Sequence, residues 1–199
     1  LGSLRASLED FAEAEELLRE ALQILRSIFS GGHSSVADCQ NQLAYVLLHK
    51  DVLRHKGELK QSEELTNEAL SMMRRLYPGD HPVLADVLGT RTSVLQTRGK
   101  FEEARESATA FLEMIRRLYP GDHRRLSLGL GLAANLHIEL QELTQAAALQ
   151  RESVEMKRRL YPNGNLSLAL GLANLAYIKS RLGKHAEAEE VGQEALAMN

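Results

Sequence analysis

The 199-residue sequence has one cysteine, no tryptophan and only 5% aromatic residues. The single cysteine, Cys39, excludes an internal disulfide framework and favours a reducing compartment, so we expect a cytoplasmic, intracellular protein. No apolar run approaches the roughly 20 residues that a helix needs to span a bilayer, and membrane insertion is not expected. The net charge of −3 lacks the basic excess that neutralises phosphates, which argues against a nucleic-acid partner.

The sequence also lacks the motifs of common enzymes and metal sites. It contains no GxSxG, no glycine-rich phosphate loop and no HExxH, so we expect neither catalytic residues nor a cofactor. His33, His81 and His123 occupy similar places in the chain, but equivalent turns of stacked repeats lie at least about 8–10 Å apart. Zinc ligands must all lie about 2 Å from one ion. We therefore interpret these histidines as turn residues and expect no metal.

One pentapeptide, Arg-Arg-Leu-Tyr-Pro, occurs three times, at residues 74–78, 116–120 and 158–162, with a spacing of 42 residues. A degenerate fourth copy at residues 26–33 lies 48 residues before the first, so one unit carries six extra residues. Self-similarity at such a period predicts a solenoid, because each unit is too small to bury its own apolar face and packs on its neighbours.

Each unit contains two segments with helical periodicity. Ala104, Ala108 and Ile115 follow one another at intervals typical of one helix face, which predicts a core face there. The six extra residues fall between positions 44 and 57, where they either lengthen a helix or form a protruding loop. The sequence predicts helices over residues 9–29, 35–54, 58–77, 82–97, 100–119, 124–140, 143–161, 166–181 and 184–198.

The turn between units is expected to break the helix sharply. Pro78 cannot donate the next backbone hydrogen bond, and Gly79 accepts turn geometry. Asp80 and Asp122 are predicted to cap the following helix through its free N–H groups. Pro82 suits an early helical position.

Small residues recur at fixed places within the units, and one unit shows them in the set Leu175, Ala176, Gly183, Ala188, Ala195 and Leu196. This arrangement resembles the tetratricopeptide repeat (TPR), whose small residues let paired helices approach closely. The usual TPR period is 34 residues, whereas the present period of 42 with its Tyr-Pro-Gly-Asp-His turn resembles the longer subclass found in kinesin light chains. The resemblance implies an all-α TPR solenoid of stacked antiparallel helix pairs that form a right-handed superhelix.

The repeat spacing also predicts the organisation of the chain. The first three residues have the composition of a cleaved expression-tag remnant. We expect the array to comprise a partial unit at 4–33, units at 34–81, 82–123 and 124–165, and a partial unit at 166–199. The two incomplete units are candidate faces for self-association.

The resemblance implies a protein or peptide partner, because the concave face of TPR solenoids is lined by the first helix of each unit and binds other proteins. Non-core positions of these helices carry amides, hydroxyls and aromatic rings, which can hydrogen-bond a peptide and supply apolar area. The expected partner-binding groove comprises Asp38, Asn41, Gln42, Tyr45, Thr90, Ser93, Gln96, Thr97, Asn135, Glu139, Asn174, Tyr177 and Arg181.

Two function hypotheses follow. The leading one is a protein-protein interaction module that binds a peptide or helical segment as an adaptor or scaffold. The alternative is a regulatory or sensor TPR solenoid within a larger signalling protein that carries an ATPase, kinase or protease. A clamp for chaperone tails is not favoured, because the early clamp positions hold Asp38, Asp86, Leu128 and Leu170 in place of cations.

Four further features have a structural interpretation. Arg91 interrupts an apolar stripe and should pair with Glu102 or Glu103, or turn outward. The arginine pairs of the repeated motif sit at helix ends, where cations offset the helix dipole; the alternative is a basic ridge that recruits an acidic partner. Glycines in the leucine-rich runs, and Ala104, are expected at close helix contacts. Those glycines are Gly129, Gly131 and Gly171.

Overall fold

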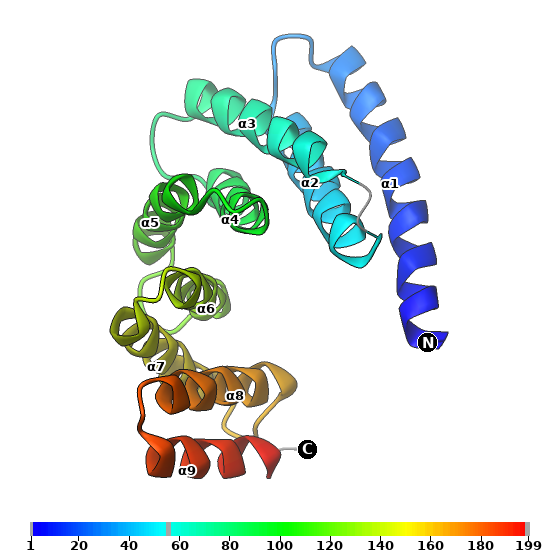
Figure 1. Ribbon diagram of the computed structural model, residues 1–199. Coiled ribbons are helices and arrows are strands. Elements are labelled where there is room, and N and C mark those ends of the chain that lie inside the picture. The colour runs from blue at the N-terminus through cyan, green and yellow to red at the C-terminus, as the bar shows by residue number, and fades with distance from the viewer. Residues whose placement is uncertain (1, 55–56, 198–199) are drawn as a thin grey trace. The chain divides into compact units, whose positions relative to one another are not determined.

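The computed structural model describes residues 2–54 and 57–197, and within these ranges the regular structure is entirely helical (Figure 1). The helices are α1 (Gly2–Ile28), α2 (Ser34–Arg54), α3 (Leu59–Leu76), α4 (Pro82–Thr97), α5 (Phe101–Leu118), α6 (Arg124–Glu139), α7 (Leu143–Leu160), α8 (Leu166–Arg181) and α9 (His185–Leu196).

The predicted helices are all present, and their observed bounds agree to within two residues except at the start of α1. That helix begins at Gly2, seven residues earlier than predicted, so Gly2 and Ser3 belong to it, while Leu1 lies outside the described residues. The extra residues of one unit lengthen α2, which has 21 residues where α4, α6 and α8 have 16. Positions 55–56 and 198–199 lie outside the described residues.

The chain divides into two compact units, residues 1–107 and 108–199. The first contains α1 to α4 and the start of α5, and the second contains the rest of α5 and α6 to α9. Within each unit consecutive helices lie side by side and run in opposite directions, as α2 does with α3 and α6 with α7 (Figure 1). The predicted all-α repeat fold is therefore confirmed.

Small residues allow the paired helices to approach closely. Ser62, Ala104 and Ala146 follow one another at the 42-residue spacing, and each is 0% exposed. The Ser62 hydroxyl also donates a hydrogen bond of 2.6 Å to the carbonyl oxygen of Ala44 on the neighbouring helix. Larger side chains at these positions would separate the helices and open the core between them.

Glycine has the same role in α6 and α8. A Cβ atom added to Gly129 would lie 2.4 Å from Ile115 Cδ1, so the interpretation as a close helix contact is confirmed there. Gly171 is similarly tight, with 3.3 Å to Lys157 Nζ. Gly131 differs, because its nearest neighbour would be Gln150 Oε1 at 3.8 Å, an ordinary contact.

The repeated histidines are the helix caps. His81 precedes α4, and its Nδ1 accepts a hydrogen bond of 3.2 Å from the backbone N–H of Val83. Its ring stacks on Tyr77 with 4.1 Å between centroids. His123 and His33 repeat both features, the first on Tyr119 and the second on Phe29. Their interpretation as turn residues is confirmed.

The prediction that Asp80 and Asp122 cap these helices is wrong. Each lies one residue before the N-cap position, which the histidine occupies. The carboxylate of Asp122 instead accepts two hydrogen bonds from Arg159, at 2.6 and 2.7 Å. Pro82, in contrast, stands at the predicted early position of α4.

The arginines of the repeated motif connect second helices of neighbouring repeats. Arg116 contacts both carboxylate oxygens of Glu152, at 3.0 and 2.8 Å. Arg158 makes the same forked contact with Glu194, at 3.1 and 2.5 Å. The degenerate first copy retains the interaction as a single 2.9 Å bond from Arg26 to Glu68. These side chains already have carboxylate partners, so their structural interpretation is confirmed.

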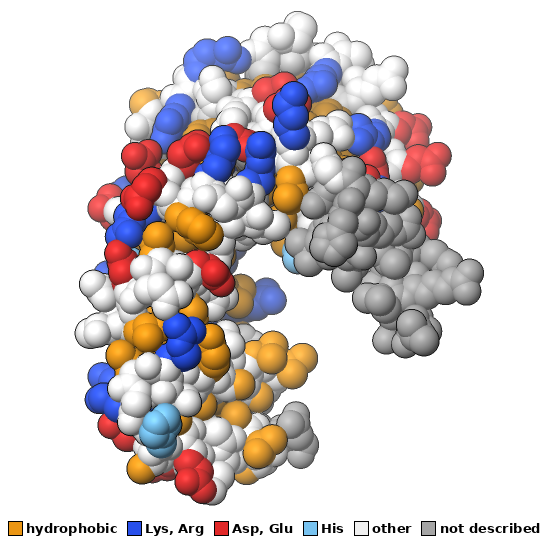
Figure 2. All heavy atoms as spheres, in the orientation of Figure 1, with side chains coloured by type: hydrophobic (Ala, Val, Ile, Leu, Met, Phe, Trp, Pro, Cys, Tyr) orange, Lys and Arg blue, Asp and Glu red, His pale blue; other side chains and the backbone are white. Residues whose placement is uncertain are grey.

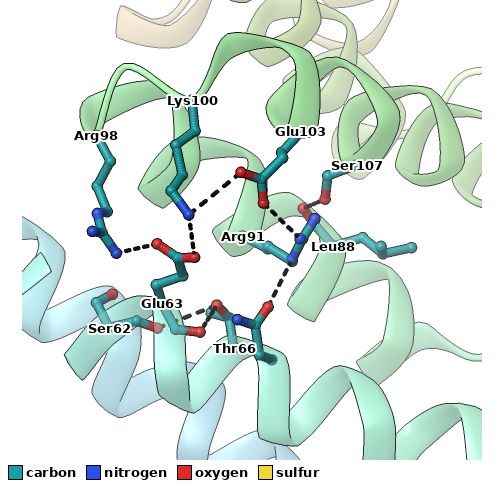
Figure 3. A network of polar contacts seen from close by, with 10 residues as sticks. Ser62, Glu63, Thr66, Leu88, Arg91, Arg98, Lys100, Glu103 and Ser107 are labelled. Atoms are coloured by element: carbon teal, nitrogen blue, oxygen red, sulfur yellow. Dashed lines mark hydrogen bonds and ion pairs between the residues drawn. The ribbon is translucent and has the colours of Figure 1, made fainter. Parts of the chain in front are cut away.

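A buried carboxylate joins α3 to the turn that precedes α5 (Figure 3). Glu63 is only 8% exposed and forms ion pairs with Arg98 and Lys100, the latter at 2.8 Å. Burial by itself would raise the pKa of Glu63, but the hydrogen bond from Lys100 and the charges of both cations outweigh it. The pKa of Glu63 therefore lies below its ordinary value.

Arg91 lies beside this network and is paired, as predicted. Its guanidinium lies 3.7 Å from a carboxylate oxygen of Glu103 and donates a 3.0 Å hydrogen bond from Nε to Asn67 Oδ1 (Figure 3). Its interruption of the apolar stripe in α4 is thus balanced by polar groups from two adjacent helices.

We expect Glu63→Gln to destabilise the protein by about 1–2 kcal/mol at neutral pH, because it removes a charged acceptor from two cations. Since the folded pKa of Glu63 is depressed, its contribution is complete above the unfolded value near 4.5 and is lost as pH falls through the folded value. Urea unfolding of both proteins from pH 7 to pH 3 should show their difference shrinking below about 4.5. Glu102→Gln, at a side chain 80% exposed, is the control and should have little effect. A difference independent of pH would contradict this assignment.

Two glycines of α6 provide a matched test of packing. Gly131→Ala should raise the free energy of unfolding by up to about 1 kcal/mol, because alanine favours the helix and finds room. Gly129→Ala should be less stable than Gly131→Ala, because its methyl group displaces the buried side chain of Ile115. Thermal unfolding of both variants measures this order. Equal midpoints would show that the helices do not meet as closely as described.

Candidate functional site

An open cavity of about 520 Å³ lies in the first unit between α1, α2 and α4. Most of the side chains around it are apolar, and amide and hydroxyl groups stand among them. Such a combination is typical of sites that bind an organic ligand or a peptide side chain. The cavity is lined by Ala14, Leu17, Leu18, Asn41, Gln42, Tyr45, Val46 and Thr90.

Two large apolar side chains of this cavity are unusually exposed, Leu17 at 58% and Tyr45 at 50%. The ring of Tyr45 packs at a tilt against His49, with 4.2 Å between centroids. Burial lowers the pKa of His49, which favours the neutral imidazole and keeps this end of the cavity uncharged at neutral pH. The Gln42 amide donates a 2.9 Å hydrogen bond to Asp38, which fixes its orientation at the rim.

Asn41 differs from the expectation that it is an exposed groove residue. It is only 7% exposed, and its Oδ1 atom has no hydrogen-bond partner among the described residues. A buried acceptor without a donor costs free energy. Asn41 therefore belongs to the wall of the cavity, and its substitution would change the packing of α2 as well as the surface.

A second cavity, of about 290 Å³, lies in the second unit between α6, α7 and α8. Two of its apolar residues, Leu128 and Leu170, are 46% and 57% exposed. Figure 2 shows hydrophobic side chains gathered over α8, the helix that supplies Leu170. The cavity is lined by Leu128, Gly131, Leu132, Asn135, Gln150, Lys157, Ser167, Leu170, Gly171 and Asn174.

Two family models, both described as tetratricopeptide repeat, match the sequence. One covers residues 47–117, and the other covers residues 1–35 and 168–199. Together they account for more than half of the chain. The chain belongs to the tetratricopeptide repeat family. Its repeats are therefore of a kind that serves protein–protein interaction.

Solved TPR structures share the fold over nearly the whole chain. A P. anserina kinesin-light-chain protein with nearly identical TPR-like repeats has a TM-score of 0.78 at 17% identity, covering 99% of this chain and 91% of that one. BtubC (BKLC) from P. vanneervenii has a TM-score of 0.80 at 18% identity, covering 100% of this chain and 76% of that one. No curated protein matches the sequence. The predicted likeness to kinesin-light-chain TPRs is thus confirmed at the level of the fold.

The two cavities bring together part of the predicted TPR groove. Asn41, Gln42, Tyr45 and Thr90 line the first, and Asn135 and Asn174 line the second. The remaining predicted residues line neither of these cavities, and they are Asp38, Ser93, Gln96, Thr97, Glu139, Tyr177 and Arg181.

Several of those remaining side chains are engaged within their own unit. The Thr97 hydroxyl donates a 2.9 Å hydrogen bond to the backbone carbonyl of Ser93, one turn earlier in α4. Arg181 donates bonds of 2.8 Å to the Tyr177 hydroxyl and to Gln141 Oε1. These contacts keep the side chains along the helix surface, where they form its rim and not a cavity wall.

Sequence reasoning missed the apolar wall from α1 and the polar floor of the second cavity. Leu17 and Leu18 were overlooked because α1 is the second helix of an incomplete unit, and only first helices were considered. Lys157 could have been found, because it stands at the 42-residue spacing from Met73 and Ile115, which are buried. A lysine at a core position of one repeat is a signal that alignment of the repeats reveals.

Other classes of site have little support in the part of the chain that the structure describes. There, histidine, cysteine and carboxylate side chains do not gather in any group of three that could hold a metal ion. The helices in the same ranges are too short or too polar to cross a membrane.

Proposed function

We propose that this TPR chain is a non-catalytic protein-interaction module, an adaptor or scaffold inside the cell, that binds a peptide or helical segment of a partner along the first helices of its repeats. The observation that carries the proposal is the 520 Å³ cavity of the first unit. It joins predicted groove residues on α2 and α4 to an exposed apolar side chain of α1.

The chemistry of this cavity suits a peptide segment. Exposed Leu17 and Tyr45 offer apolar area that a partner's aliphatic or aromatic side chain can cover. The Gln42 amide at the rim can exchange hydrogen bonds with a peptide backbone. Rigid aromatic side chains with polar neighbours are the usual anchors of protein interfaces.

The arginine edge is a weaker candidate for partner binding. Arg26, Arg116 and Arg158 are already paired with carboxylates of neighbouring helices. An acidic partner would have to displace those carboxylates and would gain little from exposed charges. The first-helix surface has no comparable internal partners for its apolar side chains.

The test is selection of binding peptides from a displayed library of random 12-residue sequences, followed by calorimetry on the selected peptides. We expect one class to lose about tenfold or more in affinity when Gln42 and Tyr45 are both replaced by alanine, because an aromatic anchor contributes more than about 1 kcal/mol. Folding should be preserved, since exposed positions usually change stability by no more than about 0.5 kcal/mol.

A matched control replaces Gln193 and Leu196 of α9 by alanine. Gln193 donates to Glu189 four residues earlier, as Gln42 does to Asp38, and Leu196 is 73% exposed. This variant should bind every selected peptide of that class as the wild type does. Selection of no peptide, or peptides that respond only to Arg116→Glu, would contradict the proposal.

A further inference from the structure

Lys157 occupies a position that is apolar in the two preceding repeats. Met73, Ile115 and Lys157 follow one another at 42-residue intervals near the ends of α3, α5 and α7. The first two are 0% and 1% exposed, and Lys157 is 6% exposed. The third full repeat therefore places an amine where its predecessors place hydrocarbon.

The partner of this position has not changed with it. Ile115 packs against Gly129, and Lys157 packs against Gly171, which lies 42 residues after Gly129. The close glycine contact of α6 is thus repeated in α8, with the Lys157 amine taking the place of the isoleucine methyl group. The amine donates one hydrogen bond of 3.1 Å, to the Ser167 carbonyl in the first turn of α8.

A second buried polar side chain stands beside the amine. Gln150 is 1% exposed and donates a 2.7 Å hydrogen bond to the Gly171 carbonyl. Its Oε1 atom is buried and has no hydrogen-bond partner among the described residues. Both Gln150 and Lys157 line the 290 Å³ cavity, so its floor is polar and incompletely satisfied.

No carboxylate of the described residues forms an ion pair with Lys157. The other buried lysine, Lys50, shows the usual solution, because it pairs with Glu15 and lies 3.4 Å from Glu58. Burial lowers the pKa of Lys157, whereas the carboxylates around Lys50 raise the pKa of that residue despite its burial. A buried cation without an anion is unfavourable, and a carboxylate brought by a partner would remove the imbalance.

The surroundings of the cavity indicate what else the partner carries. Leu128 and Leu170 are exposed at its edge and offer an apolar surface. Asn135 and Asn174 are exposed as well and present amide groups that match a continuing peptide backbone. A free ion would leave the leucines uncovered, whereas an acidic residue within an extended peptide can use all three kinds of group.

We propose that the cavity between α6, α7 and α8 is a subsite for an aspartate or glutamate side chain within an extended partner peptide, whose carboxylate accepts a hydrogen bond from Lys157 while a neighbouring apolar residue covers Leu128 and Leu170. The proposal rests on the proposed function and assigns a specificity to it. Lys157 is then a binding residue that the third full repeat retains in place of better packing.

The experiment uses an array of heptapeptides capped at both ends. The central residue is glutamate, aspartate, glutamine or asparagine, and the flanking residues vary from apolar to polar. A parallel set leaves the C-terminal carboxylate free. The wild type should retain acidic peptides with apolar flanks about tenfold better than their amide counterparts, and this preference should not require a free C-terminus.

The decisive variant is Lys157→Ile, which restores the residue that the preceding repeat uses against an equivalent glycine. It should lose the preference for acidic peptides while its thermal midpoint stays the same or rises, because a buried unpaired cation is replaced by hydrocarbon. Lys157→Met, with the residue of the repeat before, should do the same if the isoleucine variant folds poorly. Lys184→Met removes the same charge at a side chain 52% exposed and should keep the preference.

The outcomes separate this proposal from the one on which it rests. Peptides retained by the wild type without regard to the central acid would overturn the acidic subsite and leave the interaction module standing. A preference confined to free C-termini, or one that survives in Lys157→Ile, would also overturn the subsite. Retention of no peptide at all would overturn both proposals.

Discussion

The structure depends on how closely its helices can approach one another. At the 42-residue spacing Ser62, Ala104 and Ala146 are fully buried between paired helices, and each position accepts only a small side chain. A single helix pair cannot bury its remaining apolar surface, so every unit needs the next one. The histidine caps and the arginine–glutamate ties recur with the same period because they act at geometrically equivalent contacts between units.

The sequence predicted the helices well because their signals are local. Apolar periodicity and the Tyr-Pro-Gly turn act within a few residues, and the start of α4 at Pro82 was placed correctly. The caps were misassigned by one residue, since aspartate is the commoner cap and the stacking of His81 on Tyr77 is visible only in three dimensions. The partner of Arg116, 36 residues away at Glu152, could not be assigned from local pattern.

The candidate site was predicted less completely for a different reason. Which face of a first helix is exposed depends on the neighbouring helices, and the packing of α2 buries Asn41 where the sequence pattern predicted exposure. The wall supplied by Leu17 comes from α1, a helix that repeat logic assigns to structure. Lys157 needed no structure to be noticed as unusual, but its lack of a carboxylate partner did.

Cations in this chain divide according to whether a carboxylate of the same chain is within reach. Arg158 at the helix edge and Lys50 in the interior both have such partners, so their charges are balanced within the fold. Lys157 stands in the interior with one carbonyl acceptor, next to a cavity with exposed leucines. A repeat protein can change one unit at such a position because its neighbours keep their own apolar contacts, such as Ile115 against Gly129. The period thus maintains the scaffold, and the departure from it at a single core position is where a preference for a partner's charge can be added.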